Sequence, residues 1–556
     1  MSTSVLALLA FLPILSAAIM LIALRMPAKR AMPIAFIITA LVAFGVWDIP
    51  ARFILASTIQ GLFITFDILY IVFGAIVLLN LLKYSRAIRV IREGFIDISE
   101  DRRVQVVIIV WLFGSFIEGA AGFGTPAAVL APLLVGLGFP TFCAVMLGMM
   151  VQSTAVTFGA VGTPILVGVA GGVQSPELSA ELAVSGLEFS DYLQAVTSNV
   201  VILHGITGTL MPTLMVCMMT RFFGKNKSWK EGLEIFPFTL FGGLAFTIPY
   251  ALTGTYLGPE FPSLLGALVG ITVVVFAAKK GFLVPKKTWD FDDEKEWPSF
   301  WKGTLNVKLN DADKEQKLSL TKAWLPYILL AVFLVLTRLT QLPIKSWLLS
   351  FQLEWTEILG TSVSAASKPL YLPGTVLLVV GLITIGLHRM KGQSVKAAFS
   401  DSTKMLLGAG VVLVFTVPMV RIYINSGASP SDLASMPIAM AEWVSSSVGQ
   451  IYPLFTATIG ALGAFIAGSN TVSNLMFGLF QFGVASELAM PSVVIVALQA
   501  VGAAAGNMIA IHNIVAASAT VGFLGNEGLI LRKTILPTIY YLLVVGVLGT
   551  LLIFWS

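Results

Sequence analysis

A single carboxylate, Glu118, lies inside an otherwise apolar, glycine-rich stretch of the chain. Two apolar runs, 104–117 and 126–138, flank it, and the sequence between them reads EGAAGFGT. A charge within such apolar surroundings is costly and is usually functional. Glu118 could take up and release a proton. Alternatively, the amides of the surrounding turn could satisfy it, and it would then stay ionised in a structural role.

A second short polar stretch, GSNTVSN at 468–474, interrupts another pair of apolar runs near the C-terminus. Its hydroxyls and amides could bind a small hydroxylated anion, because the N-terminal end of a half-helix attracts carboxylates. Backbone carbonyls at the same place could instead hold Na⁺. The binding candidates in the two stretches are Gly122, Gly124, Thr125, Ser469, Asn470, Thr471 and Ser473.

Each polar stretch is followed by a long apolar run that small and polar residues interrupt, the second of them around 502–513. Non-helical backbone inside a membrane persists only where protein or a watery cavity satisfies it, so both breaks should line a site. The alternative is that their glycines only allow close helix packing. The first run, 140–169, holds the candidates Gln152, Ser153 and Thr154, and the second, 491–520, holds Asn507 and His512.

Other ionisable side chains also fall within apolar runs. His204, like His512, titrates near neutral pH and suits a proton relay, or it is a packed neutral histidine. Asp67 could move protons or could bond to a neighbouring helix. Arg421 could bind a substrate carboxylate through a bidentate pair, or it could snorkel to the interface as we expect Arg338 to do. For proton coupling, Glu118 and His512 are the candidates.

Composition places the chain in the membrane. Of 556 residues, 57% are hydrophobic and only 11% are charged, whereas a soluble protein carries about 25% charged residues. The mean hydropathy is +0.91. The net charge of +5 is spread over short loops and does not indicate nucleic-acid binding. The two cysteines, Cys143 and Cys217, form no metal-binding pattern, and we expect no cofactor.

The hydropathy pattern predicts an all-α polytopic membrane protein with about twelve transmembrane helices and two re-entrant hairpins in inverted repeats. The hairpins are 104–138 and 451–485, because their arms are shorter than the roughly 20 residues that a crossing takes. The expected crossings are 5–24, 31–47, 54–82, 140–169, 191–220, 233–256, 261–278, 323–340, 371–388, 405–424, 491–520 and 534–554. The single transporter domain, 1–556, consists of a first half 1–278, a cytoplasmic polar loop 279–322 and a second half 323–556.

Lysine and arginine gather in six loops, while 171–191 and 425–450 hold none. The positive-inside rule therefore places the six basic loops in the cytoplasm and both termini outside it. The first hairpin then enters from the inside and the second from the outside, so the repeats are inverted. Inverted repeats bind substrate near the bilayer midplane, where we expect the tips 118–125 and 468–474 to meet.

Five motifs resemble the lactate permease family of bacterial proton symporters. They are FIEGAAGFGTP at 116–126, FGAVGTP at 158–164, GPE at 258–260, VRIYINSG at 420–427 and GFLGNEG at 522–528. The resemblance implies symport of L-lactate, D-lactate or glycolate with a proton across the bacterial inner membrane. It also implies kinship with a wider group of ion transporters that carry paired hairpins and often work as elevators.

The chain departs from this family's pattern in its second half. Asn470 stands where the pattern has an acidic residue, Asn507 where it has a lysine, and His512 where glutamine is common. The tip 469–471 is also similar to the sodium-binding tip of dicarboxylate symporters, so a sodium-coupled organic-anion symporter is the alternative function.

Two other classes are poorly supported. No His-Glu-x-x-His motif or phosphate-binding loop occurs, which argues against hydrolysis and ATP-driven pumping. Inverted repeats with unlike tips argue weakly against a passive channel. The lipid bilayer, a small organic anion and a coupling proton are the expected partners, and the oligomeric state is open, with a homodimer as one alternative.

Overall fold

The computed structural model describes residues 2–24, 26–96, 98–122, 124–304, 318–339, 341–428 and 433–555. Residues 305–317 of the predicted polar loop, and 429–432 of the loop 425–450, therefore lie outside the described residues. Within those ranges the chain is mostly helical, and its only sheet is a small antiparallel hairpin in which Trp355 pairs with Ala365. The strands are β1 (Leu353–Trp355) and β2 (Ala365–Ser367).

Twelve helical stretches of the described residues are long and apolar enough to cross a membrane, which confirms the all-α polytopic class. They are Thr3–Leu21, Ala28–Gly45 (α2), Ala51–Tyr84 (α3), Arg102–Ala121, Val156–Val173, Phe189–Phe223, Phe236–Tyr256 (α15), Pro262–Lys279 (α16), Leu320–Arg338 (α17), Gly392–Ala428, Ser492–Ala519 and Glu527–Trp555 (α26). The number agrees with our prediction, but Arg102–Ala121 takes the place of Pro373–Leu387 (α19), which has only 15 residues.

The first arm of the first hairpin is therefore long enough to cross, and our expectation that it is too short was wrong. Re-entry of the hairpins and inversion of the repeats stay predictions.

The further helices are α1 (Thr3–Ala18), α4 (Ala87–Ile96), α5 (Arg102–Gln105), α6 (Gly114–Ala121), α7 (Thr125–Gly136), α8 (Thr141–Met150), α9 (Gly159–Thr163), α10 (Ala170–Val173), α11 (Pro176–Ser185), α12 (Phe189–Thr209), α13 (Met211–Phe223), α14 (Trp229–Leu233), α18 (Pro343–Ser350), α20 (Gly392–Ile424), α21 (Met436–Val448), α22 (Pro453–Ala467), α23 (Asn470–Glu487), α24 (Ser492–Asn507) and α25 (Ile511–Ala519).

Glycine forms both hairpin tips. In the first, between α6 and α7, Gly122 has φ +62° and ψ −158°, a backbone region that is essentially restricted to glycine. In the second, Gly468 ends α22 in the left-handed region at φ +69°. Ser469 then begins α23, and its hydroxyl accepts the Val472 amide at 3.5 Å, as N-cap serines do.

Both predicted breaks occur within the predicted ranges, but the second is shorter than the sequence indicated. In the first break, Ala160, Val161 and Gly162 have φ values of +41°, +55° and +79°, and the π-helical segment Pro164–Val169 follows. Two of these left-handed residues carry a Cβ, so the backbone is strained. The second break is shorter than predicted, because α24 continues to Asn507 and α25 begins at Ile511.

Gly502 and Gly506 therefore lie inside α24, where the packing interpretation applies. A Cβ on Gly502 would lie 2.0 Å from the carbonyl oxygen of Ala457, and one on Gly506 would lie 2.3 Å from that of Ala461. Glycines four residues apart allow two helix backbones to approach closely. Here they seat α24 directly on α22.

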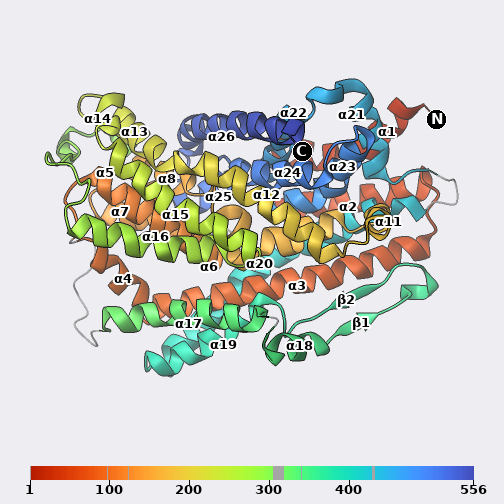
Figure 1. Cartoon of the computed structure of the whole chain (residues 1–556), viewed down its shortest axis with the longest axis horizontal. Coiled ribbons are helices and arrows are strands. Elements are labelled where there is room, and N and C mark those ends of the chain that lie inside the picture. Colours follow the sequence, from red (N-terminus) through yellow and green to blue (C-terminus); the bar gives the residue numbers. More distant parts are fainter. Residues whose placement is uncertain are drawn as a thin grey trace.

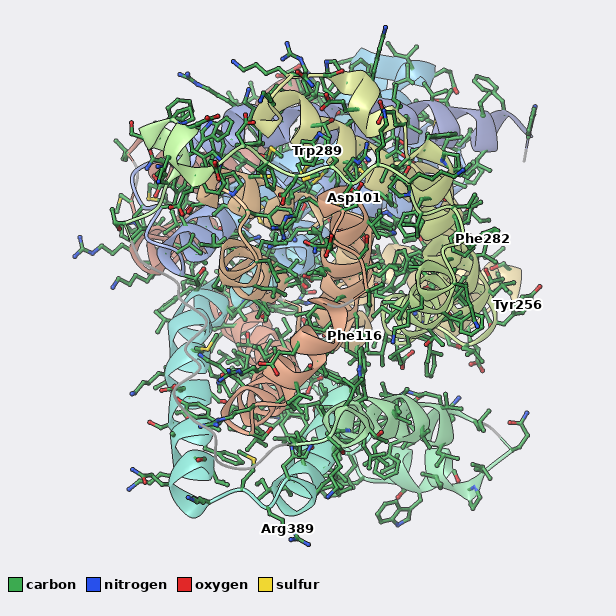
Figure 2. All side chains as sticks on the ribbon, turned by 90° about the vertical axis from the view of Figure 1, so that its left-hand side faces the viewer. Asp101, Phe116, Tyr256, Phe282, Trp289 and Arg389 are labelled. Atoms are coloured by element: carbon green, nitrogen blue, oxygen red, sulfur yellow. The ribbon has the colours of Figure 1, made fainter. Side chains whose placement is uncertain are left out.

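The helices form two layers. α3 packs against α19 and α20, α20 against α2, and α17 against α19 and α4; we call this group the scaffold layer. In the other group, the site layer, α15 packs against α16, α16 against α6, α12 against α15 and α24, and α22 against α24 and α26. Figure 1 shows α3, α17 and α19 along one edge of the molecule. Figure 2 shows Arg389 at that edge, with Trp289 and Asp101 on the site-layer side.

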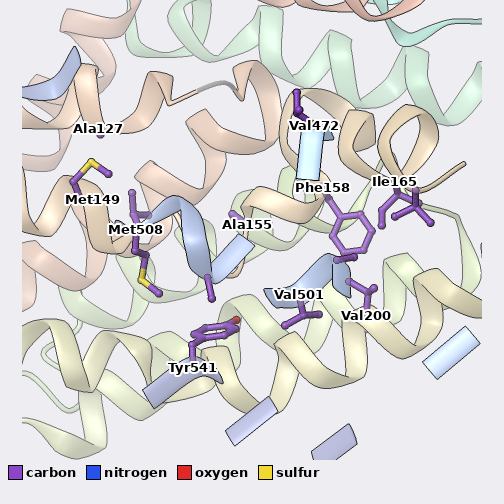
Figure 3. Packing of buried hydrophobic residues seen from close by; sticks show 14 of the residues in the cluster. Ala127, Met149, Ala155, Phe158, Ile165, Val200, Val472, Val501, Met508 and Tyr541 are labelled. Carbon is purple, nitrogen blue, oxygen red and sulfur yellow. The ribbon is translucent and has the colours of Figure 1, made fainter. Parts of the chain in front are cut away.

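Several short segments within predicted loops are folded, namely α4, α11, α14, α18, α21 and the β hairpin. At the centre of the site layer, apolar side chains from the first break, α12, α23 and α24 share one core (Figure 3), including Phe158, Val200, Val472 and Val501. The breaks are therefore packed into the protein and are not exposed to lipid.

We predict that Gly502→Ala lowers thermal stability, because the new methyl forces α24 away from α22. The expected loss is on the order of 1–3 kcal/mol, as for overpacked cores. Gly408→Ala is the matched control, since no atom lies within 4 Å of a Cβ at that position of α20. Melting of the purified proteins in detergent would measure both, and equal melting temperatures would contradict the close-packing role.

Candidate functional site

Residues of both hairpin tips, of the first break and of the helix ends on either side of the second break line one cavity of about 290 Å³. This volume is at the small end of the range for ligand pockets, so it suits a small solute. Apolar side chains of the scaffold layer close the opposite side. The lining consists of Ala28, Val72, Glu118, Gly122, Gly124, Val156, Gly159, Ala160, Pro164, Val412, Leu413, Ala467, Gly468, Ser469, Asn470, Thr471, Val472, Asn507 and His512.

A larger hollow of about 710 Å³ lies elsewhere, at the ends of α3, α17 and α19, with Tyr84, Lys322 and His388 among its lining residues. It includes no residue of a tip or a break. Because neither the polar tips nor the interrupted helices contribute to it, we take the smaller cavity as the candidate site.

Glu118 is buried, with 2% of its surface exposed, and its Oε2 atom has no hydrogen-bond partner among the described residues. Gly159 of the first break faces it: a Cβ on Gly159 would lie 2.4 Å from Oε1 of Glu118. Gly159 itself has ordinary extended dihedral angles, so it is required for space. An ionised carboxylate with an unpaired buried oxygen needs a donor or a proton.

The second tip is hydrogen-bonded to the first break. The Asn470 side-chain amide donates to the hydroxyl of Thr157 and to the carbonyl of Ala500, both at 3.4 Å. The Asn474 amide donates to Asn470 Oδ1 at 2.6 Å and to the Pro164 carbonyl at 3.4 Å. These bonds fix both polar atoms of the Asn470 side chain.

His204 extends this network into the protein interior and does not line the cavity. Its Nε2 lies 2.8 Å from the hydroxyl of Thr157 and its Nδ1 lies 2.6 Å from the hydroxyl of Tyr541. The Tyr541 hydroxyl also lies 2.9 Å from that of Thr154. Because both ring nitrogens meet neutral hydroxyls in a fully buried place, the packed, neutral histidine is the interpretation that the geometry supports.

Amides tie the first tip to α25, which follows the second break. Asn513 donates to Gln152 Oε1 at 3.0 Å, and the Gln152 amide lies 3.4 Å from the carbonyl of Gly124. His512 lies beside the second tip, since a Cβ on Gly468 would be 2.7 Å from its Nδ1. Asn507 brings a buried Oδ1 atom with no partner among the described residues.

The structure brings eight of the predicted site residues into the cavity lining: Glu118, Gly122, Gly124, Ser469, Asn470, Thr471, Asn507 and His512. The others lie outside it: Thr125, Gln152, Ser153, Thr154, Ser473 and Arg421. Ser153 donates to the carbonyl of Met150, and Ser473 donates to that of Gly460. Such residues stabilise the tips and breaks through hydrogen bonds and do not line the cavity.

Both arginines within the apolar runs have protein partners. The structure therefore does not support the snorkelling that we expected for Arg338, nor that alternative for Arg421. Arg421 is 3% exposed and donates to Gln60 and to the carbonyls of Gly171 and Gln174. Arg338 forms an ion pair with Glu260. Asp67 accepts a hydrogen bond from Ser367, so it has a hydrogen-bonding partner, but this partner lies on strand β2 and not on the neighbouring helix that the alternative named.

Sequence reasoning missed the apolar part of the lining, including Val72, Val412 and Leu413, and the support from Thr157 and Tyr541. The apolar residues carry no signal, because they resemble every other residue of their helices. Thr157 was detectable in principle, since it lies within the predicted break two residues before Gly159.

Comparison with known proteins agrees with the motifs. The family model described as L-lactate permease matches residues 6–555. The chain belongs to the L-lactate permease family. Among curated permeases, a putative L-lactate permease of Haemophilus influenzae is 31% identical over 494 residues, which cover 85% of this chain and 84% of the relative. The glycolate permease GlcA of Escherichia coli is 29% identical, with 98% and 95% covered. An L-lactate permease of Escherichia coli is 27% identical with the same coverage.

For this permease we predict that Gly159→Ala strongly reduces uptake, because its methyl group occupies the place of the Glu118 carboxylate. A loss of about tenfold or more is expected, which corresponds to roughly 1.4 kcal/mol. Gly386→Ala is the control, since that position of α19 has no atom within 4 Å of a Cβ. The measurement is substrate uptake by vesicles that contain each variant. If Gly159→Ala took up substrate as fast as the wild-type protein, the spacing role of Gly159 would be contradicted.

Proposed function

We propose that this membrane protein is a secondary active transporter that imports a small 2-hydroxy monocarboxylate, such as L-lactate, D-lactate or glycolate, together with a proton. The observation that carries the proposal is the cavity, in which Glu118 and the polar second tip meet. The relatives are named as permeases for L-lactate and for glycolate, which supports this substrate class and supports a transporter over an enzyme.

The second tip is suited to the substrate carboxylate. Ser469, Asn470 and Thr471 form the N-terminal end of α23 and line the cavity. Unpaired amides and the positive end of the helix dipole attract an anion at such a place. The amides and hydroxyls that surround it offer partners for the 2-hydroxyl group of the substrate.

Glu118 is the proposed proton carrier. It is the only carboxylate among the lining residues of the cavity, and a proton on it would cancel its charge beside the arriving anion. A proton that moves with a monovalent anion makes an electroneutral cycle, so one titrating group is enough. His512 lines the same cavity and is the second candidate.

The relatives give no support to the sodium-coupled organic-anion symporter. The 469–471 tip remains the place where Na⁺ would bind if uptake depended on it. A requirement of the wild-type protein for Na⁺ would overturn proton coupling.

We predict that Glu118→Gln abolishes uptake driven by a pH gradient but still permits exchange of labelled for unlabelled substrate. Glutamine keeps the shape of the side chain and cannot carry a proton. Both processes would be measured in proteoliposomes with lactate and glycolate, with Glu181→Gln on the exposed face of α11 as the control. If Glu118→Gln still accumulated substrate on a pH gradient, the proton would travel by another group, and His512 would be tested next.

We also propose a location in the bacterial inner membrane with the basic loops in the cytoplasm. An alkaline phosphatase fused to the C-terminus should then be active, and a green fluorescent protein fused there should be dark. The same reporters inserted in the loop 279–322 should give the opposite result. A fluorescent C-terminal fusion would contradict this orientation.

A further inference from the structure

An ion pair joins the two layers. Arg338, the last residue of α17, places Nε 2.7 Å from Oε1 of Glu260 in the turn between α15 and α16. The side chains are 8% and 7% exposed, and the guanidinium lies 4.1 Å from the ring centre of Tyr371. Because α17 belongs to the scaffold layer and α15 and α16 to the site layer, this buried pair bridges the boundary between them.

The turn that carries Glu260 packs on the first break. A Cβ on Gly162 would lie 2.4 Å from the carbonyl oxygen of Pro259 and 3.1 Å from the amide nitrogen of Glu260. Gly162 is the last left-handed residue of the break, and Ala160 at its start lines the cavity. Arg338 of the scaffold layer is therefore linked, through Glu260, to the backbone segment that lines the cavity.

A second scaffold arginine holds the other end of the same segment. Arg421 of α20 donates from Nη1 to the carbonyls of Gly171 at 3.1 Å and Gln174 at 3.3 Å. These carbonyls end α10, and a cation is favourable at a helix C-terminus. Its Nε donates to Gln60 of α3 at 2.7 Å. The scaffold layer thus contacts the end of α10 directly, through Arg421, and contacts the first break only through Glu260.

Both contacts lie at the same end of the molecule, away from the basic loops. α17 and α20 begin beside each other, since Lys322 and Lys391 line one hollow, and the two arginines lie at the far ends of these helices. The cavity lining, by contrast, includes Ala28, the first residue of α2, which Lys29 and Arg30 follow.

We propose that the Arg338–Glu260 ion pair is a gate contact of the transport cycle. It joins the layers while the cavity reaches toward the basic loops, and it separates when the cavity opens to the opposite side. Removal of one partner from a buried pair leaves an uncompensated charge, but opening at this end admits water to both groups as they part. The ion pair is therefore stable while the layers are joined, and water solvates both partners once the layers have parted. This inference rests on the proposed transport function, since it requires a site that opens alternately to two sides.

A reversible cross-link tests the proposal. Arg338→Cys with Glu260→Cys would be combined in a chain in which the two buried native cysteines carry Cys143→Ala and Cys217→Ala. A flexible bis-methanethiosulfonate reagent, as long as the side chains it replaces, would join the new thiols. The matched control is Arg102→Cys with Asp290→Cys, an ion pair at 2.9 Å within the site layer.

The cross-link between positions 338 and 260 should abolish lactate uptake, reduction should restore it, and lactate binding in detergent should persist. The control cross-link should leave uptake intact. Uptake by the cross-linked 338/260 protein would overturn the proposal. If the reduced double variant did not transport, the rate of cross-linking would be measured with and without lactate. A rate that lactate changes at 338/260 but not at 102/290 supports a gate, and an unchanged rate at 338/260 refutes it. An incorrect substrate class would be recognised separately, as absence of lactate uptake by the unmodified protein.

Discussion

The structure depends on one constraint: backbone that leaves the helix inside an apolar protein must find hydrogen-bond partners there. The first break meets it through side chains of three different helices. Tyr250 of α15 donates to the carbonyl of Thr154 at 2.9 Å, Ser263 of α16 donates to that of Ala155 at 2.7 Å, and Asn474 of α23 reaches that of Pro164 at 3.4 Å. Each partner is buried. The break therefore cannot move without the helices that satisfy it, and this makes the site layer a single unit.

The contents of the cavity follow from the same requirement. The polar groups of the site layer are used mainly to stabilise its own breaks, so those that face the cavity are few, and Glu118 stands out among them. The scaffold layer has no interrupted helix at this level and presents apolar side chains to the cavity. The two layers can therefore separate without breaking many hydrogen bonds, because the scaffold side of the boundary is apolar and the polar groups of the site layer bond to one another. The contacts of Arg338 and Arg421 are the exceptions.

Much of this arrangement could be predicted from the sequence. Glycine and polar residues inside apolar runs have few explanations in a membrane, so the tips and the first break were located by composition alone. The errors have physical causes. Gly502 and Gly506 indicated a break but serve close packing, and glycine alone does not distinguish the two uses. Gln152 and Ser473 have the polarity of ligand-binding residues, yet their partners are backbone and side chains of the tips, which only the folded chain reveals. Arg421 lies near a helix end in the sequence, and its burial comes from α3 and α10, far away along the chain.

The position of Val72 and Val412 in the cavity wall has a consequence for selectivity. A substrate held by its carboxylate at the second tip, as proposed above, would have its carbon skeleton beside these side chains of the scaffold layer. One buried methyl group contributes about 0.8 kcal/mol, so lactate would be favoured over glycolate by roughly fourfold while the layers are together. In the proposed cycle that preference would be lost when the layers part, because Val72 and Val412 belong to the scaffold layer and the proposed carboxylate site belongs to the site layer. Discrimination between the two acids would then depend on the scaffold layer, whereas binding of their carboxylate would depend on the site layer.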